Sequence, residues 1–295
     1  MESDEQMVLL WFALTILSAQ VINHCYKRAD GLTGGSTLFN FLFTALCVLG
    51  CGGLLLLNGP SFSEGTLILG IGTGLALAAA AALYTKALAC GPFVISTALF
   101  GTSSLLPIAY CAIYPGEALT LWQYGGYVLL IICGFVMVWK KESSGKKRAG
   151  FNYKWIVLIL LTVLVNSMIP YGIRIQSQLA PDESVEMLFL YFGTACILNL
   201  VLAVRAGCFR EKWRKQASDA LPVALIMAFS ICLNTWVQSR IGAENVPAII
   251  QFSVINACGL WLSAVTGKIF YSERLTWLQY AALGLTVISG VMISL

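Results

Sequence analysis

The sequence predicts an all-α integral membrane protein whose ten helices cross the bilayer, and three observations support this prediction. Hydrophobic residues make up 58% of the 295 residues. Charged residues make up only 11%, about half the charged share of a soluble domain. The apolar residues gather in ten runs of about 20 residues, the length that a helix needs to cross roughly 30 Å of hydrocarbon. These runs use most of the chain, so no room remains for a soluble domain.

Hydropathy and helix-breaking residues together place the ten helices near 7–26, 36–57, 66–88, 92–114, 119–139, 154–175, 185–205, 221–240, 247–270 and 275–295. Pro92, Pro222 and Pro247 lie at expected first turns, where the missing N–H of proline costs no hydrogen bond. Gly-Pro at 59–60 and Pro-Gly at 115–116 mark turns between helices.

The ten cysteines lie in the apolar runs or near basic loops, without a CxxC pair or the spacing of metal ligands. We interpret them as small buried hydrophobic residues and not as a disulfide framework. The sequence therefore predicts no metal site, and none of its motifs indicates a cofactor. The acidic start, Met1 to Gln6, lacks the basic segment of a cleaved signal peptide, so we expect the first apolar run to remain as a helix.

The basic residues set the expected orientation, because Lys and Arg accumulate in cytoplasmic loops. Sixteen of the 18 Lys and Arg residues fall in or beside the loops that follow the odd-numbered helices, and only Arg174 and Arg240 fall on the other side. We therefore expect a cytoplasmic linker at 140–153 and both termini outside. The net charge of +4 follows from this topology and indicates no nucleic-acid partner.

The sequence repeats itself at a spacing of 156 residues. Residues 117–134 read EALTLWQYGGYVLLIICG, and residues 273–290 read ERLTWLQYAALGLTVISG. The chain thus divides into a first five-helix repeat at 1–139, the basic linker at 140–153 and a second five-helix repeat at 154–295. Because five is odd, the second repeat enters the membrane inverted relative to the first. Such a 5+5 inverted repeat is typical of transporters, whose substrate site lies between the repeats near the midplane.

The motif that begins the last helix of each repeat resembles that of a known family. It reads Gly116-Glu117-Ala118-Leu119-Thr120 with Gln123, and again Ser272-Glu273-Arg274-Leu275-Thr276 with Gln279, and Pro107 lies upstream of the first copy. With the inverted repeat, these residues resemble the drug/metabolite transporter superfamily, and more narrowly its EamA-like members. The resemblance implies alternating access through a central cavity lined mainly by helices 1, 3, 4, 6, 8 and 9. Many members have cytoplasmic termini, so the outside termini expected here depart from the family pattern.

Polar side chains within the apolar runs form stripes on single helix faces. Such groups are expensive in hydrocarbon unless they face a cavity or another helix. From these stripes and the aromatic residues near them we expect the substrate to contact Gln20, Asn23, His24, Tyr84, Ser103, Tyr110, Asn166, Tyr171, Asn234, Trp236, Gln238, Gln251 and Asn256. The alternative is that these groups hydrogen-bond between packed helices and never touch the substrate.

A second set of residues has an expected role in gating or in structure: Lys86, Arg174, Arg240, Glu117, Glu273, Pro107 and Pro170. Lys86 and Arg240 occupy equivalent positions in the two repeats, where they either guard the mouths of the path or extend to the membrane surface. The two glutamates either stabilise helix N-termini or take part in coupling. Each of the two prolines either interrupts its helix and exposes backbone groups for a ligand or makes a tolerated kink.

The sequence favours a secondary transporter for a small polar metabolite in the plasma membrane, functional as a monomer and without enzymatic activity. All 14 acidic residues lie in loops or at helix ends, whereas a multidrug exporter of organic cations normally requires an embedded carboxylate. A membrane-embedded enzyme acting on lipid phosphates requires clustered His, Asp, Glu or Arg, and His24 is the only histidine. A scaffold or receptor does not require an inverted repeat. Besides the substrate, we expect only membrane lipids as partners.

Overall fold

The computed structural model describes residues 2–29, 31–32, 35–91, 93–114, 116, 118–138, 153–209, 213–244, 246–271 and 276–295. Throughout these ranges the regular structure is helical, and no strand is found. Eight helices in them are long and apolar enough to cross a membrane, and two further apolar segments are shorter, Leu99–Ile113 and Leu121–Val136. The prediction of an all-helical protein with many membrane-length helices is therefore confirmed.

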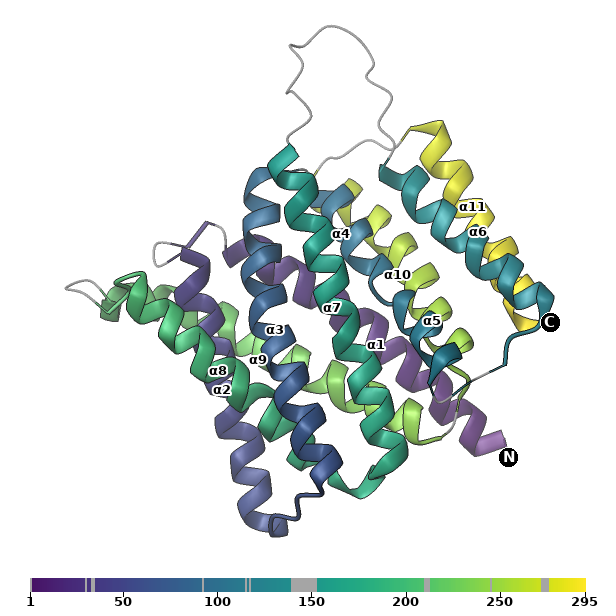
Figure 1. The fold of residues 1–295 in the computed structure, drawn as a ribbon. Helices are drawn as coiled ribbons and strands as arrows, with labels where there is room; N and C mark the ends of the chain where they lie inside the picture. Colours follow the sequence, from purple (N-terminus) through teal and green to yellow (C-terminus); the bar gives the residue numbers. More distant parts are fainter. Residues whose placement is uncertain are drawn as a thin grey trace, which may run out of the picture. The chain divides into compact units, whose positions relative to one another are not determined.

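Contacts divide the chain into two compact units, and each unit takes residues from both expected repeats (Figure 1). Unit 1 is formed by Met1–Thr85 with Met168–Val246, and unit 2 by Lys86–Ser167 with Pro247–Leu295. The boundary between units falls inside two helices, α3 and α7. Most of the linker expected at 140–153 lies outside the described residues.

Unit 1 contains α1 (Glu2–Ala29), α2 (Gly35–Asn58), most of α3 (Glu64–Cys90), the second part of α7 (Tyr153–Leu179), the short 3-10 helix η1 (Pro181–Glu183), α8 (Ser184–Arg205) and α9 (Trp213–Ala243). Helix α1 packs on α9, and α2 packs on both α8 and α9. Glycine allows α3 to approach α8 closely, because a Cβ atom at Gly74 would lie 2.5 Å from the carbonyl oxygen of Tyr191. Buried aromatic rings fill the interior. The rings of Tyr26 and Tyr84 meet edge to face, with their centroids 5.4 Å apart.

Unit 2 contains the end of α3, α4 (Phe93–Thr102), α5 (Leu106–Ile113), α6 (Leu121–Val138), the first part of α7, α10 (Ala248–Tyr271) and α11 (Trp277–Ser294). Helix α10 packs on α4, α5, α6 and α11, and α6 also packs on α11, beside which it runs in Figure 1. At the α6–α11 contact Ser289 Oγ donates a 2.7 Å hydrogen bond to the carbonyl of Gly126. A Cβ atom at Gly126 would lie 2.9 Å from the carbonyl of Ser289, so glycine permits this approach.

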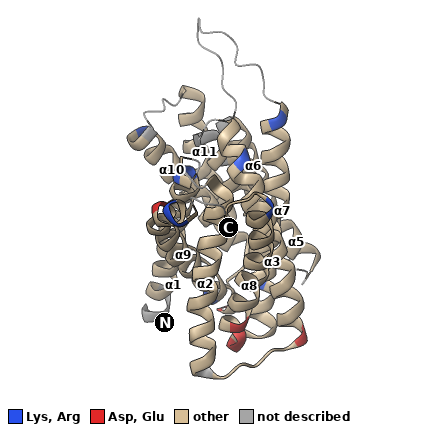
Figure 2. Ribbon diagram, turned by 90° about the vertical axis from the view of Figure 1, so that its left-hand side faces the viewer, with Lys and Arg blue, Asp and Glu red and all other residues tan. Residues whose placement is uncertain are grey.

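Acidic residues gather at the end of unit 1 where α3 and α8 begin (Figure 2). The carboxylate of Glu183 accepts hydrogen bonds from Ser63 Oγ at 2.7 Å and from Ser63 N at 3.0 Å. Glu186 accepts a 3.3 Å hydrogen bond from Ser61 N. These two side chains therefore bind the backbone that leads into α3, where N–H groups have no helical partner.

The expected spans agree with the helices to within a few residues, with two exceptions. The span at 92–114 is divided into α4 and α5. The span expected from 221 begins at Trp213, so the prediction that Pro222 lies in a first turn was wrong. Pro222 cannot donate to the carbonyl of Ser218, but both residues are exposed, and an exposed carbonyl keeps access to other donors. Pro247 directly precedes α10, and Pro92 lies outside the described residues.

Candidate functional site

The fourth expected helix is broken in the middle, and its polar residues lie at the break. Helix α4 ends at Thr102, and α5 begins at Leu106 with Pro107 in its first turn. Proline has no N–H, and its ring clashes with the carbonyl four residues earlier, which is that of Ser103. Pro107 therefore explains the interruption. Of the two alternatives for the prolines, Pro107 marks a break, whereas Pro170 lies inside the continuous helix α7.

Three consecutive hydroxyl groups bind the backbone carbonyls at the end of α4. Thr102 Oγ1 donates to the carbonyl of Leu99 at 2.6 Å, and Ser103 Oγ donates to that of Phe100 at 2.6 Å. Ser104 Oγ repeats the pattern with Gly101 at 2.8 Å. Each bond spans three residues, and the hydroxyls of Ser103 and Ser104 add to the backbone N–H groups of the same residues, which donate to the same two carbonyls at 3.1 Å. The break is thus stabilised by its own sequence.

Two asparagines from other helices of unit 2 reach this break. Asn166 of α7 donates from Nδ2 to Ser103 Oγ at 2.7 Å, and Asn256 of α10 donates from Nδ2 to the carbonyl of Gly101 at 2.8 Å. Asn256 is only 2% exposed, and its Oδ1 has no hydrogen-bond partner in the described part of the chain. A buried acceptor without a donor costs about 1–3 kcal/mol. A ligand that donates a hydrogen bond to Asn256 would remove this cost.

Tyr110 brings an aromatic hydroxyl to the same cluster. Its OH lies 3.2 Å from Ser167 Oγ. Ser167 Oγ donates its proton to the carbonyl of Leu164 at 2.6 Å, so Tyr110 is the donor in the pair. Tyr110 and Asn166 are half-buried, whereas Ser103 and Ser167 are buried. We call Ser103, Tyr110, Asn166, Ser167 and Asn256 the α4–α5 site. Gln251, also predicted to contact the substrate, is buried on α10.

Pro170 adds a backbone group beside the α4–α5 site. Within a helix the N–H of residue 170 would bind the carbonyl of Asn166, and proline cannot make this bond. Asn166 therefore brings two groups to the site. Its side chain donates to Ser103, and its backbone carbonyl lacks the usual helical donor.

The predicted residues of unit 1 form a different kind of contact, a clamp between α1 and α9. Asn234 of α9 donates from Nδ2 to the carbonyl of Thr15 at 2.8 Å and to Ser18 Oγ at 2.9 Å. Its Oδ1 accepts from Gln238 Nε2 at 2.7 Å. Both protons and the oxygen of the Asn234 amide are thus used within unit 1, which favours the interpretation that this residue holds packed helices together.

Further predicted residues of unit 1 lie on α1, α3 and α7. Asn23 of α1 accepts a 3.2 Å hydrogen bond from the hydroxyl of Tyr84 on α3. Gln20 is buried and His24 is half-buried on α1. On α7, Tyr171 is half-buried and Arg174 is only 2% exposed.

The residues expected at the mouths of the path are mostly exposed. The guanidinium carbon of Arg240 lies 5.4 Å from the centre of the Trp236 ring, and both residues are exposed on α9. Trp236 is two residues from Asn234, so it faces away from the clamp. Lys86 is exposed, whereas buried Arg174 packs near Gly242 of α9. Glu117 and Glu273 lie outside the described residues.

The sequence analysis missed the role of the repeated Thr and Gln residues. Thr120 and Gln123 bond each other's backbone N–H groups at 3.2 and 3.0 Å at the start of α6. Thr276 and Gln279 do the same at 3.4 and 2.8 Å at the start of α11. This is a capping box, and the spacing T-x-x-Q before an apolar run was the signal that could have identified it.

The α4–α5 site is a cluster of neutral hydrogen-bonding groups. Its residues offer amide, hydroxyl and backbone groups, and within the described ranges no group of His, Cys, Asp or Glu residues could hold a metal ion. None of the ten cysteines forms a disulfide, and five of them are buried. The arrangement presents acceptors for a polar solute together with one aromatic ring.

Comparison with known proteins identifies the fold alone. No family model matches the sequence, and no curated protein is similar to it. Among solved structures, one described only as "Crystal structure of protein" has a TM-score of 0.65 at 16% sequence identity. The match covers 97% of this chain and 96% of that chain. The order and course of the helices are thus shared with a known structure over nearly the whole length.

Proposed function

We propose that the protein is a secondary transporter that moves a small polar metabolite across the membrane by alternating access. The observation that carries this proposal is the broken helix α4–α5 with amide groups from α7 and α10 bound at the break. Irregular backbone at membrane depth is tolerated where it is buried in protein or lines a cavity, and interrupted helices of this kind form the substrate sites of many transporters.

The hydrogen-bond inventory at the site favours a solute with N–H or O–H donors. The hydroxyls of Thr102, Ser103 and Ser104 donate to backbone carbonyls, and the amide of Asn256 donates to Gly101. Among the buried side-chain atoms of the site in the described part of the chain, Asn256 Oδ1 is the acceptor without a partner, and the carbonyl of Asn166 lacks its usual helical donor. A neutral or zwitterionic metabolite supplies donors of this type without requiring a carboxylate as counter-ion.

The alternative, an exporter of organic cations, has less support. The segments that build the α4–α5 site, 93–114, 153–167 and 248–271, contain no Asp or Glu. A permanent cation moved out of water into such a site would lack a charged partner, and an unpaired buried charge is costly. An enzyme of lipid phosphates has still less support, because the site offers neither an acid–base pair nor a metal-binding group among the described residues.

Contacts within each unit support the 5+5 inverted repeat as part of the proposal. Helices at equivalent positions of the two repeats pack on each other: α2 on α8, α4 and α5 on α10, and α6 on α11. A two-fold axis between two repeats brings such equivalents together. Gly126 contacts Ser289, and a shift by the 156-residue repeat turns this pair into Ala282 and Cys133, which share one buried cluster.

The same proposal includes orientation, location and oligomeric state. The basic residues favour a cytoplasmic 140–153 linker and termini outside. We also propose that the protein lies in the plasma membrane. Ten helical segments are enough to enclose a path within one chain, so we propose a functional monomer.

Counterflow into proteoliposomes tests the proposal. The purified protein is reconstituted into vesicles that are loaded with amino acids, sugars, nucleosides or organic cations. It should exchange at least one neutral or zwitterionic solute. Asn256→Ala and Asn166→Ala should each lower that flux at least tenfold, because they remove the amides at the break. Ser104→Ala is the matched control, since its hydroxyl serves only its own helix in the structure, and it should retain most of the flux. Exchange of quaternary cations alone, or full flux in both asparagine variants, would contradict the proposal.

A further inference from the structure

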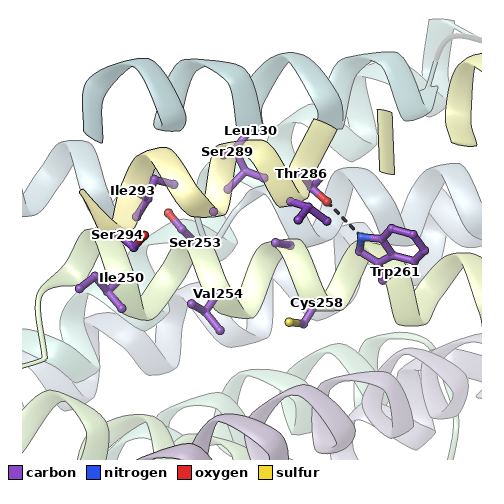
Figure 3. Close-up of a pocket in the computed structure, with 13 residues that line it drawn as sticks. Leu130, Ile250, Ser253, Val254, Cys258, Trp261, Thr286, Ser289, Ile293 and Ser294 are labelled. Atoms are coloured by element: carbon purple, nitrogen blue, oxygen red, sulfur yellow. Dashed lines mark hydrogen bonds between the residues drawn. The ribbon is translucent and has the colours of Figure 1, made fainter. Parts of the chain in front are cut away.

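A narrow apolar groove runs along unit 2 between α10 and α11, away from the polar contacts of the α4–α5 site (Figure 3). Its volume is about 280 Å³, and Leu130 of α6 contributes to its lining. On α10 the groove extends from Ile250 through Val254 and Cys258 to Trp261, which lie along one face in Figure 3. On α11 it extends from Thr286 to the end of the helix.

The length of the groove corresponds to one leaflet of a bilayer. Ile250 and Trp261 are 11 residues apart, or about 16 Å at 1.5 Å per residue. Half of a hydrocarbon core about 30 Å thick is roughly 15 Å. Helix α10 has 24 residues, so the groove begins near the N-terminus of α10 and ends near the middle of that helix.

The width of the groove admits one hydrocarbon chain. A volume of about 280 Å³ spread along about 16 Å of α10 makes the groove long and narrow, which is the shape of an extended hydrocarbon chain. A helix from a second copy of the protein is about 10 Å across, so it could place only side chains in the groove, whereas a hydrocarbon chain can lie along its whole length. At the inner end, Trp261 Nε1 donates a 3.1 Å hydrogen bond to Thr286 Oγ1, which ties α10 to α11 and closes the groove at the membrane centre.

One hydroxyl in the groove differs from the others in its hydrogen bonding. Four hydroxyls line it, and three of them donate to carbonyls of the protein: Thr286 to Leu283 at 2.7 Å, Ser289 to Gly126 at 2.7 Å and Ser294 to Val291 at 2.8 Å. The fourth, Ser253 Oγ, is buried in a residue that is 3% exposed, and it has no hydrogen-bond partner in the described part of the chain. Ser253 thus has a hydroxyl proton without an acceptor inside the lining of the groove.

We propose that this groove binds one acyl chain of a glycerolipid from the leaflet in which α10 begins, with Ser253 Oγ donating to the ester carbonyl. Ser253 is five residues from the start of α10, about 7–8 Å along the helix. Side chains on a helix tilt toward its N-terminus, which moves this hydroxyl toward the membrane surface, where lipid esters lie. The chain beyond the ester then fills the apolar groove as far as Trp261.

Gly290 offers a way to fill the groove without disturbing the protein. It lines the groove, and a Cβ atom added there would meet no atom within 4 Å. Its equivalent in the repeat, Gly134, is packed, since a Cβ there would lie 2.7 Å from Thr102 Cγ2. Gly290→Leu should thus occupy the space of the acyl chain. Gly284→Leu is the matched control, because Gly284 is also open, lies on α11 and is outside the groove.

Photo-crosslinking with a diacyl phosphatidylcholine that carries a diazirine in one acyl chain tests the proposal on the purified full-length protein. Mass spectrometry should map the adduct to residues 250–261 and 286–294. Competition by unlabelled diacyl lipid should be at least fivefold stronger than by its dialkyl ether analogue, which lacks the ester carbonyl. Ser253→Ala should remove this difference, and Gly290→Leu should remove the adduct at the groove while Gly284→Leu retains it.

Three outcomes would overturn the proposal: an unchanged adduct in Gly290→Leu, an ester preference that persists in Ser253→Ala, or a dimer that Gly290→Leu converts to monomer. Size-exclusion chromatography with the same variants provides the oligomeric state. Because lipid binding is measured directly, the result is independent of transport activity.

Discussion

The amide side chains of Asn256 and Asn234 differ in whether they keep a hydrogen-bonding group without a partner. Asn256 donates from Nδ2 and leaves Oδ1 without a partner among the described residues, whereas Asn234 has both protons and its oxygen bonded inside unit 1. An amide with all its bonds made within the protein stabilises helix packing, and one with a bond to spare suits a ligand. Asparagine in a polar stripe thus has two roles here: Asn234 holds packed helices together, and Asn256 keeps an acceptor that suits a ligand.

The structural role of Asn234 leads to a prediction at this scale. Asn234→Ala removes three hydrogen bonds, and each is worth about 0.6 kcal/mol on average within a membrane. We expect the free energy of unfolding in mild detergent to fall by about 2 kcal/mol, with the apparent KM of the remaining folded protein unchanged. Thermal unfolding and counterflow on the same sample measure both. A raised KM with unchanged stability would instead place Asn234 in contact with the substrate.

The partners of individual amides could not be predicted from the sequence. Asn234 contacts Thr15, which is 219 residues away along the chain, and Asn256 contacts Gly101. A stripe on a helix shows which face is polar, but not which helix that face meets. The unbonded Oδ1 of Asn256 depends on a register between α10 and α4 that no local pattern encodes.

At the scale of the helix, the sequence predicts position well, because bilayer thickness demands an apolar run of fixed length. Nine of the ten expected spans each coincide with one helix. The fourth span reads as one apolar run, yet its Thr102-Ser103-Ser104 hydroxyls and Pro107 stabilise a turn inside it. The early start of α9 was missed because residues 213–220 are polar, and hydropathy does not report a helix that continues beyond the apolar run.

The close approach of α3 and α8 depends on glycine at position 74, on the face of α3 that meets α8. Gly74→Ala would place a Cβ atom 2.5 Å from the carbonyl oxygen of Tyr191 and 2.7 Å from Thr194 Cβ. Overpacking of this kind costs about 1–3 kcal/mol. We expect a lower midpoint in thermal unfolding for this variant.

Gly72→Ala is the matched control on the same helix, because a Cβ there meets nothing within 4 Å. This variant should unfold at the wild-type temperature or slightly above it, since alanine favours helix more than glycine does. Equal destabilisation by both substitutions would show that backbone flexibility of α3, and not its contact with α8, sets the stability.

For the whole molecule, the inverted repeat predicted from the sequence constrains the topology independently of the charges. An odd number of helices in each repeat forces the linker at 140–153 to lie on the face opposite to both termini. Sixteen of 18 basic residues fall on the expected linker side, so the electrostatic bias and the repeat predict the same topology from independent properties of the sequence. The alternating access that we propose would follow from this symmetry, because two inverted copies of one fold can exchange conformations and thereby open the site to opposite sides.

Epitope tags at the N-terminus, the C-terminus and within 140–153 test this topology in intact cells. We expect antibody binding to both terminal tags without permeabilisation and to the linker tag only after it, because the basic linker is retained in the cytoplasm. A cytoplasmic protein labelled in parallel controls for leaky cells. Termini and linker on the same face would require an even number of crossings in each half, which is incompatible with five-helix repeats. The site at the α4–α5 break would then lack the symmetry that lets it open alternately to the two sides, and transport by this mechanism would have to be abandoned.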